Sequence, residues 1–219
     1  MIIRSGLIRK RDDVDFARFS EHWRHVHGPL ALQVDGMRAY RQNHILARRP
    51  SPQAARLHRV DGISQLWFDD IGSMRGAMES AEQRACVEDL RTFLDGVTIV
   101  VQQEGDTRQH GNTSRLPAKF VYLLGGPDAA LKALDEKLFA ALAALWKSMA
   151  LRTNRVINEE HSADPVARSG HKVVDAVLEI WLPEGANDDA MQSALADTID
   201  IVVIGAFQVD EVTLKALQR

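Results

Sequence analysis

Cysteine is almost absent from this chain of 219 residues, because Cys86 is the only one. A single cysteine excludes an intrachain disulfide and any Cys-x-x-Cys pair, and it is typical of a reducing compartment. Cys86 has no recognisable base beside it, so we interpret it as a small buried hydrophobe. A Gly-rich phosphate loop and a His-Glu-x-x-His helix are missing too, which leaves nucleotide and zinc sites without support. We therefore expect neither a cofactor nor a metal.

Long apolar runs and an excess of one charge are also missing. The longest apolar run spans residues 138–146, far below the roughly 20 residues that a membrane helix needs. The 27 Lys and Arg residues against 30 Asp and Glu residues give a net charge of −3, which does not favour nucleic-acid binding. The first residues carry no apolar signal segment. We expect a cytoplasmic protein that binds neither nucleic acid nor membrane.

Histidines are concentrated in residues 19–44. Apolar residues at positions 16, 19, 23, 26 and 30 recur at spacings of three and four, which predicts an amphipathic helix. Gly28 and Pro29 should end this helix, because glycine accepts a left-handed cap and proline cannot continue the hydrogen-bond ladder. Trp23 and His27 then share the buried side, with His27 in the last turn.

His27 is the first candidate for chemistry. Bare carbonyls at a helix end favour the protonated imidazole, whereas burial favours the neutral one. A group under both influences can titrate near neutrality, which suits a proton carrier. The alternative is a buried histidine that only caps a backbone carbonyl.

Residues 37–46 have the pattern of a strand, so alternate side chains share a face. Tyr40, Gln42 and His44 fall on one face, and Arg41 and Asn43 fall on the other. A tyrosine, an amide and a histidine in a row indicate the lining of a wet pocket. The alternative is a partly exposed edge strand.

Helix and strand signals alternate along the whole chain and predict an α+β fold with the order βαββαβ in each half. Two such units form tandem ferredoxin-like repeats with antiparallel sheets. We expect a first repeat at residues 1–105 that carries the site, a polar linker at 106–118, and a degenerate repeat at 119–219. The expected strands are 2–8, 37–46, 60–68, 97–103, 119–124, 151–158, 171–182 and 199–209, and the later helices are 71–80, 83–94, 128–149 and 187–197.

A constant spacing of 114 supports the repeat. It matches Arg38, Arg41, Val60, Asp61 and Trp67 with Arg152, Arg155, Val174, Asp175 and Trp181. In the third strand, residues 60, 62, 64, 66 and 68 should face the helices. Asp61, Gln65 and Trp67 should face a second sheet and line the cavity of a barrel between the two halves.

Three segments together resemble the EthD-like family of the dimeric α+β barrel superfamily. They are Trp23-x-x-x-His27-Gly28-Pro29-Leu30, Tyr40-Arg41-Gln42-Asn43-His44 and Gln65-Leu66-Trp67-Phe68. The resemblance covers residues 2–104 and implies a barrel made of two sheets, which single-domain relatives build as homodimers. Some relatives resemble lactone isomerases in which histidines move protons, and others resemble cyclases and cofactor-free monooxygenases.

Two functions follow. One is a cofactor-independent isomerase, cyclase or monooxygenase of catabolism or secondary metabolism that acts on a small hydrophobic carbonyl or lactone compound. The other is a non-catalytic binding or accessory protein of a degradation pathway. The predicted catalytic residues are His27, His44 and Tyr40, and the predicted substrate-binding residues are Trp23, Asn43, Asp61, Gln65 and Trp67.

Several alternatives stay open. His22 and His25 are three residues apart, but we expect a solvated helix surface there rather than a metal site. Trp67 and Trp181 are typical of barrel core, and the recurrence of Asp61 in the second half favours a structural role. Exposed strand edges and arginine-rich loops lead us to expect a homodimer.

Overall fold

The structure is a computed structural model that describes residues 1–51, 53–158, 174–187, 189–196, 198 and 200–217. The first half contains β1 (Ile2–Lys10), α1 (Phe16–His22), the π-helix η1 (Trp23–His27), α2 (Gly28–Ala31), β2 (Ala39–Arg48), the 3-10 turn η2 (Ala54–Arg56), β3 (Gly62–Phe68), α3 (Ile71–Met78), α4 (Ala81–Phe93) and β4 (Leu94–Gln103). The second contains β5 (Arg108–His110), β6 (Ala118–Gly125), α5 (Asp128–Leu145), β7 (Met149–Asn158), β8 (Ala176–Leu182), α6 (Asp189–Ala196) and β9 (Val202–Lys215). The polar loop expected at 159–170 and the strand start expected at 171–173 lie outside the described residues.

Short polar residues begin three of the helices. The side chains of Asp15, Asp70 and Ser80 accept hydrogen bonds from backbone N–H groups three residues ahead, at the starts of α1, α3 and α4. Each bond satisfies a donor that the first helical turn cannot pair internally. These local signals explain why the helix starts could be predicted closely.

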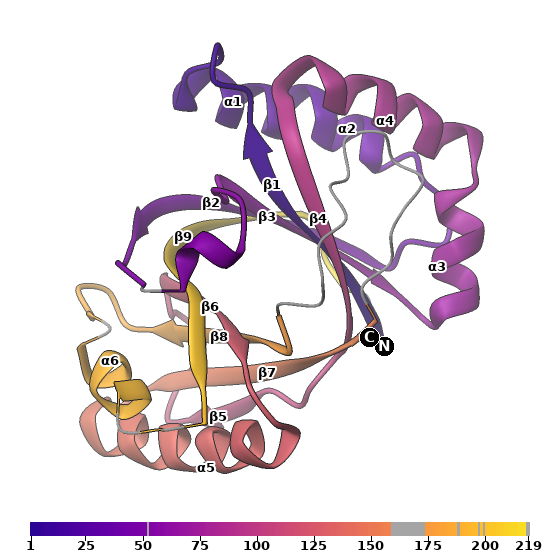
Figure 1. The fold of residues 1–219 in the computed structure, drawn as a ribbon. Coiled ribbons are helices and arrows are strands. Elements are labelled where there is room, and N and C mark those ends of the chain that lie inside the picture. The colour runs from indigo at the N-terminus through magenta and orange to yellow at the C-terminus, as the bar shows by residue number, and fades with distance from the viewer. Residues whose placement is uncertain (52, 159–173, 188, 197, 199, 218–219) are drawn as a thin grey trace.

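The strands form one antiparallel sheet that closes on itself. Its order is β4-β1-β3-β2-β9-β6-β8-β7-β5, and β4 also pairs with β7. Every strand except β5 is therefore part of a closed barrel (Figure 1). The strand edges expected to be exposed are paired, so among the described strands only β5 has an open edge. The argument for a homodimer from open edges is thus wrong.

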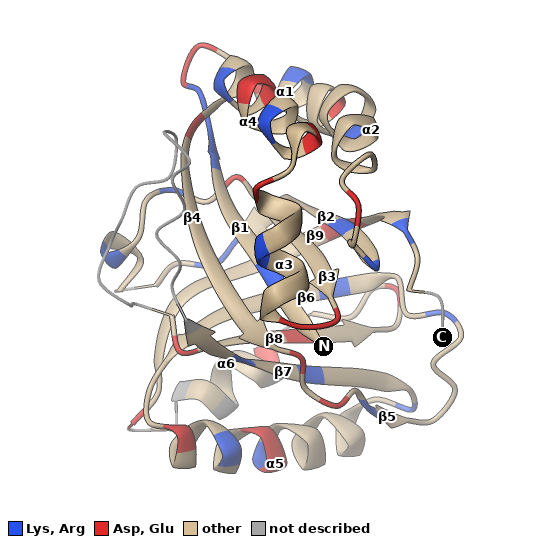
Figure 2. Ribbon diagram, turned by 90° about the vertical axis from the view of Figure 1, so that its right-hand side faces the viewer, with Lys and Arg blue, Asp and Glu red and all other residues tan. Residues whose placement is uncertain are grey.

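Each half contributes four neighbouring strands in the same order, β4-β1-β3-β2 and β9-β6-β8-β7. The halves meet at two seams, where β2 pairs with β9 and β4 pairs with β7. Figure 1 shows the helices outside the barrel, with α1 to α4 over the first four strands and α5 and α6 over the second four. Figure 2 shows Lys and Arg interspersed with Asp and Glu along α4 and α5, as the balanced composition led us to expect.

Side-chain alternation sorts the core into layers. The helix-facing layer of the first half contains Leu66 and Phe68, as predicted for the third strand. The layer inside the barrel combines Ile63 of the first half with Val177 of the second. Val60 also belongs to this inner layer, which contradicts its expected helix-facing position. Val60 precedes β3, so the alternation of the strand does not extend to it.

The bounds of several elements differ from the prediction. The helix expected to reach residue 149 ends at Leu145, and β7 begins at Met149. The expected linker contains β5, which pairs with β7. The last strand runs to Lys215 instead of residue 209, because its end pairs with β2 across the seam. Pairing across the seam is a tertiary contact that no local pattern reveals.

The constant spacing of 114 fails between the second and third strands. Trp67 pairs with Ala39, and Trp181 pairs with Ala150. If the two tryptophans are equivalent, their partners are 150 − 39 = 111 positions apart. The alignments proposed for the second strand, including that of Arg41, are therefore wrong by three residues.

Candidate functional site

The helix that carries His27 does not end where the sequence predicts. Gly28 has φ −56° and is right-handed, and the helical path continues through Pro29 to Ala31. The turn at Trp23–His27 is instead widened into a π-helix, in which Gly28 N–H donates to Trp23 O. Such widened turns are often found at functional sites. A Cβ on Gly28 would come within 2.6 Å of Leu214 Cδ1, so a larger residue here would require the Leu214 side chain to shift.

The widened turn places His22 and His27 on the same side. On an α-helix, the side chains of residues i and i+5 point in different directions. In a π-helix the backbone hydrogen bonds join residues i and i+5, and their side chains lie on the same side. Both imidazoles reach one carboxylate on α4. His22 Nε2 lies 2.9 Å from Asp89 Oδ1, and His27 Nδ1 lies 2.9 Å from Asp89 Oδ2. His22 is therefore not the solvated residue we expected, whereas His25 is exposed as expected.

Asp89 fixes how the two histidines are protonated. Burial alone would raise the pKa of Asp89, but hydrogen bonds from His27 and His22 outweigh burial and lower it. An ionised carboxylate only accepts, so His27 donates its Nδ1 proton. In neutral His27 the basic lone pair is then on Nε2, to which no described residue is hydrogen bonded. This arrangement is that of a histidine base oriented by a carboxylate.

A second chain of hydrogen bonds ends at Tyr40. Gln42 Nε2 donates to Trp23 O at 2.7 Å and to Tyr40 Oη at 3.0 Å. The amide oxygen of Gln42 must then accept from His44 Nε2, 3.1 Å away, and His44 Nδ1 accepts from Ser20 Oγ at 2.8 Å. Hydrogen bonds are thus donated from Ser20 to His44, from His44 to Gln42 and from Gln42 to Tyr40. Tyr40 accepts in this series, so its own hydroxyl proton remains available for another acceptor.

Burial keeps both His44 and Tyr40, in this series of hydrogen bonds, uncharged. It lowers the pKa of His44 to about 4, with a further contribution from the positive charge of Arg24. Burial also raises the pKa of Tyr40, against the hydrogen bond from Gln42. His44 is therefore neutral and Tyr40 keeps its proton over the physiological range. Tyr40 can donate a hydrogen bond, and His44 holds Gln42 in place.

A cavity of about 50 Å³ lies between the first half's sheet and its helices. Its lining residues with a polar group in the side chain are Arg4, Trp23, His27, Tyr40, Ser64, Gln83 and Cys86. Cys86 is buried as predicted, and burial raises its pKa to about 11, so its thiol stays protonated. A 150 Å³ cavity holds benzene, so a ligand of that size would require the walls to move.

The sheet separates the predicted site residues into two groups. Trp23, His27 and Tyr40 line the cavity on the helix side of the sheet. His44 does not line the cavity, and both of its ring nitrogens are hydrogen bonded. The predicted substrate-binding residues Asn43, Gln65 and Trp67 point to the opposite side, inside the barrel. Asp61 directly precedes β3, is buried and binds Arg48 and Arg59.

Polar and charged side chains fill the middle of the barrel. Asn43 donates to Gln65 at 3.0 Å and receives a hydrogen bond from Lys119 at 2.8 Å. Lys119 also lies 2.7 Å from Glu179, whose other oxygen binds Arg152 at 2.6 Å. All five side chains are buried. The barrel interior is therefore a paired network in this region rather than the open cavity expected.

Trp67 and Trp181 belong to the same network, since the guanidinium of Arg152 lies 5.6 Å and 5.5 Å from their rings. Burial would raise the pKa of Glu179, but Arg152 and Lys119 outweigh burial and lower it strongly. The expectation that the tryptophans are barrel core fits this packing.

Sequence reasoning missed three residues of the site. Asp89 and His22 meet only because of the widened turn, which leaves no signal in the sequence. Arg4 is different, because it occupies a helix-facing position of β1, next to Ile2 and Gly6, and is only 8% exposed. A charged residue on the buried face of a predicted strand was a signal that could have been used.

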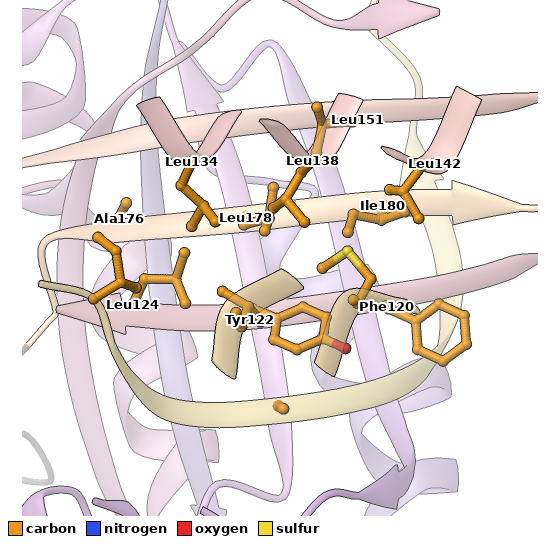
Figure 3. Close-up of a cluster of buried hydrophobic side chains, with 14 of the residues drawn as sticks. Phe120, Tyr122, Leu124, Leu134, Leu138, Leu142, Leu151, Ala176, Leu178 and Ile180 are labelled. Atoms are coloured by element: carbon orange, nitrogen blue, oxygen red, sulfur yellow. The ribbon is translucent and has the colours of Figure 1, made fainter. Parts of the chain in front are cut away.

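The second half has no comparable site in its described residues. Figure 3 shows the space between its sheet and α5, where Leu134, Leu138 and Leu142 meet Leu178 and Ile180. The cluster is continuous and includes Tyr122 as its one hydroxyl group.

Residues 11–96 match the profile of the EthD domain family. This segment is an EthD domain. The match contains the widened turn, the Tyr40 strand and Asp89, and the family predicted from the sequence is thereby confirmed. No curated protein matches the sequence significantly.

Solved structures that resemble the whole chain share the barrel fold of the EthD half and its partner. An anthrone oxidase-like protein is 6% identical, covers 99% of this chain and 94% of its own, and has a TM-score of 0.57. A mutant chlorite dismutase from Candidatus Nitrospira defluvii is 9% identical, with coverage of 94% and 91% and a TM-score of 0.52. A proposed monooxygenase from Lactobacillus acidophilus is 12% identical, with coverage of 98% and 94% and a TM-score of 0.50. At such identities the likeness concerns the fold alone.

Proposed function

We propose that the EthD domain binds a small, mostly apolar carbonyl or lactone compound in the cavity between its sheet and its helices and transfers a proton on it. The observation that carries this proposal is that His27, oriented by Asp89, and Tyr40, with its proton available, line one cavity. A base and a hydrogen-bond donor on the same cavity are the two groups that proton abstraction beside a carbonyl needs.

His27 is the base in this reaction. Its Nε2 takes a proton from the carbon next to the carbonyl, and the electrons of that C–H bond form the enolate. The negative charge of Asp89 stabilises the imidazolium that results. Return of the same proton to a different carbon of the enolate completes an isomerisation, so atoms and electrons balance without an oxidant.

Tyr40 and Arg4 stabilise the oxygen. The Tyr40 hydroxyl, aligned by Gln42, donates to the carbonyl oxygen as it becomes an enolate. Arg4 lines the same cavity and places a positive charge near that oxygen. His44 acts as a positioning residue, because it contacts Gln42 and Ser20 rather than the cavity.

The walls limit the substrate to a compact and largely apolar compound. Trp23, Leu66 and Leu90 form much of the apolar lining. A volume of about 50 Å³ is below that of a benzene-sized cavity. Even a five-membered unsaturated lactone is about as large as benzene, so the walls move when it binds, and the smallest such lactones are the suitable probes.

The test uses α-angelica lactone, a β,γ-unsaturated lactone that becomes α,β-unsaturated when one proton moves. Isomerisation is followed by ultraviolet absorbance, and exchange of the α-protons in D2O is followed by NMR. We expect catalysis by the wild-type protein and a fall of about 10²-fold or more in His27→Ala. His25→Ala is the matched control, because His25 lies on the same helical segment but is exposed. Equal rates in wild type and His27→Ala would refute the proposal.

The accessory function predicts a different result with the same cavity. The lactone would then bind, as seen by a change in tryptophan fluorescence, without exchange or isomerisation. One observation favours the accessory function: both ring nitrogens of His44 are hydrogen bonded, so only one of the two predicted catalytic histidines remains for proton transfer.

We also infer that the second half is a degenerate copy of the first that supplies the partner sheet within one chain. The shared strand order supports this, as does a matched pair of contacts. Asn43 donates to Gln65, and Asn154 donates to Glu179. Superposition of the two halves of an experimental structure tests this inference, since a different path of the chain in the second half would contradict it.

A further inference from the structure

A second cavity, of about 290 Å³, lies between the loop that carries η2 and strand β9. It shares no lining residue with the cavity beside His27. The loop is attached to β9, because Ser51 Oγ donates to Val203 O at 2.5 Å and Arg49 N–H donates to Ala206 O at 2.9 Å. Figure 1 shows η2 beside β9, on the barrel rather than under the helices.

The inner wall of this cavity is apolar. Val60, Ile204 and Phe207 belong to the inner layer of the barrel core, and Leu57 packs against that layer. The volume is about twice that of a cavity that holds benzene. It therefore suits an apolar body of two fused rings or a chain of roughly ten carbon atoms.

Three arginines, Arg48, Arg49 and Arg59, line the same cavity. Asp61 lies beside two of them, with Oδ1 2.6 Å from Arg48 Nη2 and 3.1 Å from Arg59 Nε. The single negative charge of Asp61 neutralises only one of these two guanidinium groups, so a net positive charge remains. The side chains of Arg48 and Arg59 are 41% and 47% exposed. No Asp or Glu is among the described lining residues.

We propose that this cavity binds an amphipathic monocarboxylate, aromatic or aliphatic, of roughly ten carbon atoms. Arg59 binds the carboxylate through its two Nη groups, which can form two parallel hydrogen bonds to it. Arg48 adds positive charge beside it, because its Nε and Nη2 already donate to Val60 O. Phe207, Ile204 and Leu57 contact the apolar body. A mostly apolar pocket with a few convergent polar groups is the usual form of a small-molecule site.

Titration calorimetry with 2-naphthoate tests the proposal, and 2-naphthalenemethanol serves as the neutral probe of similar shape. We expect one saturable site for the acid, with an affinity that falls as NaCl is added and is higher than that for the alcohol. Arg59→Gln should weaken naphthoate binding by about 10-fold or more and leave the alcohol unchanged. Arg18→Gln on the exposed face of α1 is the matched control.

A blocking variant tests the position of the site independently. Ala54 is exposed on η2 at the cavity lining, so Ala54→Trp should fill the cavity without disturbing the core. Naphthoate binding should be lost in this variant while its circular dichroism spectrum stays that of the wild type, and it should persist in His27→Ala. Wild-type affinity in Ala54→Trp, equal affinities for acid and alcohol, or no saturable binding at millimolar naphthoate would each overturn the proposal.

Discussion

Replacement of His44 by glutamine should remove a defined part of the acid sensitivity of the fold. His44 is 2% exposed, and its pKa is lowered from 6.5 to about 4, chiefly by burial. In the unfolded chain the imidazole regains its ordinary pKa. Between pH 6.5 and pH 4 the unfolded chain therefore binds more protons at this residue than the folded protein does, and stability falls as the pH falls.

The size of the effect follows from the two pKa values. The contribution of His44 to the free energy of unfolding is fully present above pH 6.5 and is lost by about pH 4. A difference of this size corresponds to a total of about 3 kcal/mol, of which about 2 kcal/mol is lost between pH 7 and pH 5. The acidic groups Asp89 and Glu179, whose pKa values are lowered, act in the same direction but at lower pH.

Urea unfolding at pH 7, 6 and 5, followed by tryptophan fluorescence and circular dichroism, measures this contribution. The loss of stability between pH 7 and pH 5 should be about 2 kcal/mol smaller in His44→Gln than in the wild type. His25→Gln should behave as the wild type, because His25 is exposed. The same pH dependence in His44→Gln and wild type would show that His44 is not held neutral by burial.

Other predictions concern the core and the assembly. Glu179→Gln should destabilise the protein by about 3 kcal/mol in urea unfolding, the low end for breaking a buried pair, because Lys119 and Arg152 lose the carboxylate that they share and keep only Glu211 and Glu104. Glu88→Gln, on an exposed pair, should cost less than about 1 kcal/mol. Trp23→Ala should cost about 3–5 kcal/mol, more than His27→Ala, and the reverse order would make His27 a structural residue. The homodimer remains a prediction from the arginine-rich loops, and light scattering that gives a single 24.4 kDa species at high concentration would contradict it.

Element types and faces could be predicted because they depend on neighbours in the sequence. The spacing of Phe19 and Trp23 gave a buried helix face, and the alternation around Leu66 gave the correct two faces of the third strand. The predicted pair Trp23 and His27 lines a cavity with Tyr40, since helix and strand periodicity alone determines which side each residue occupies.

The sequence did not predict which cavity these residues share. Glycine at 28 and proline at 29 normally end a helix, but the turn at Trp23–His27 is widened and the helix continues to Ala31. The predicted barrel cavity is instead filled by charges such as Lys119 and Glu179 from the second half. Pairing of charges across a barrel depends on strand order and register, which local patterns do not contain.

The sequence by itself therefore determined most of the helices and strands, the faces of the strand interiors and the family of the first half. Only the tertiary structure decided that Asp89 joins His22 and His27, that Arg4 lines their cavity, and that Asn43 faces away from it. The physical reason is one of range. Backbone periodicity is fixed by contacts over a few residues, whereas a site is made by side chains that the packing of distant elements brings within about 3 Å.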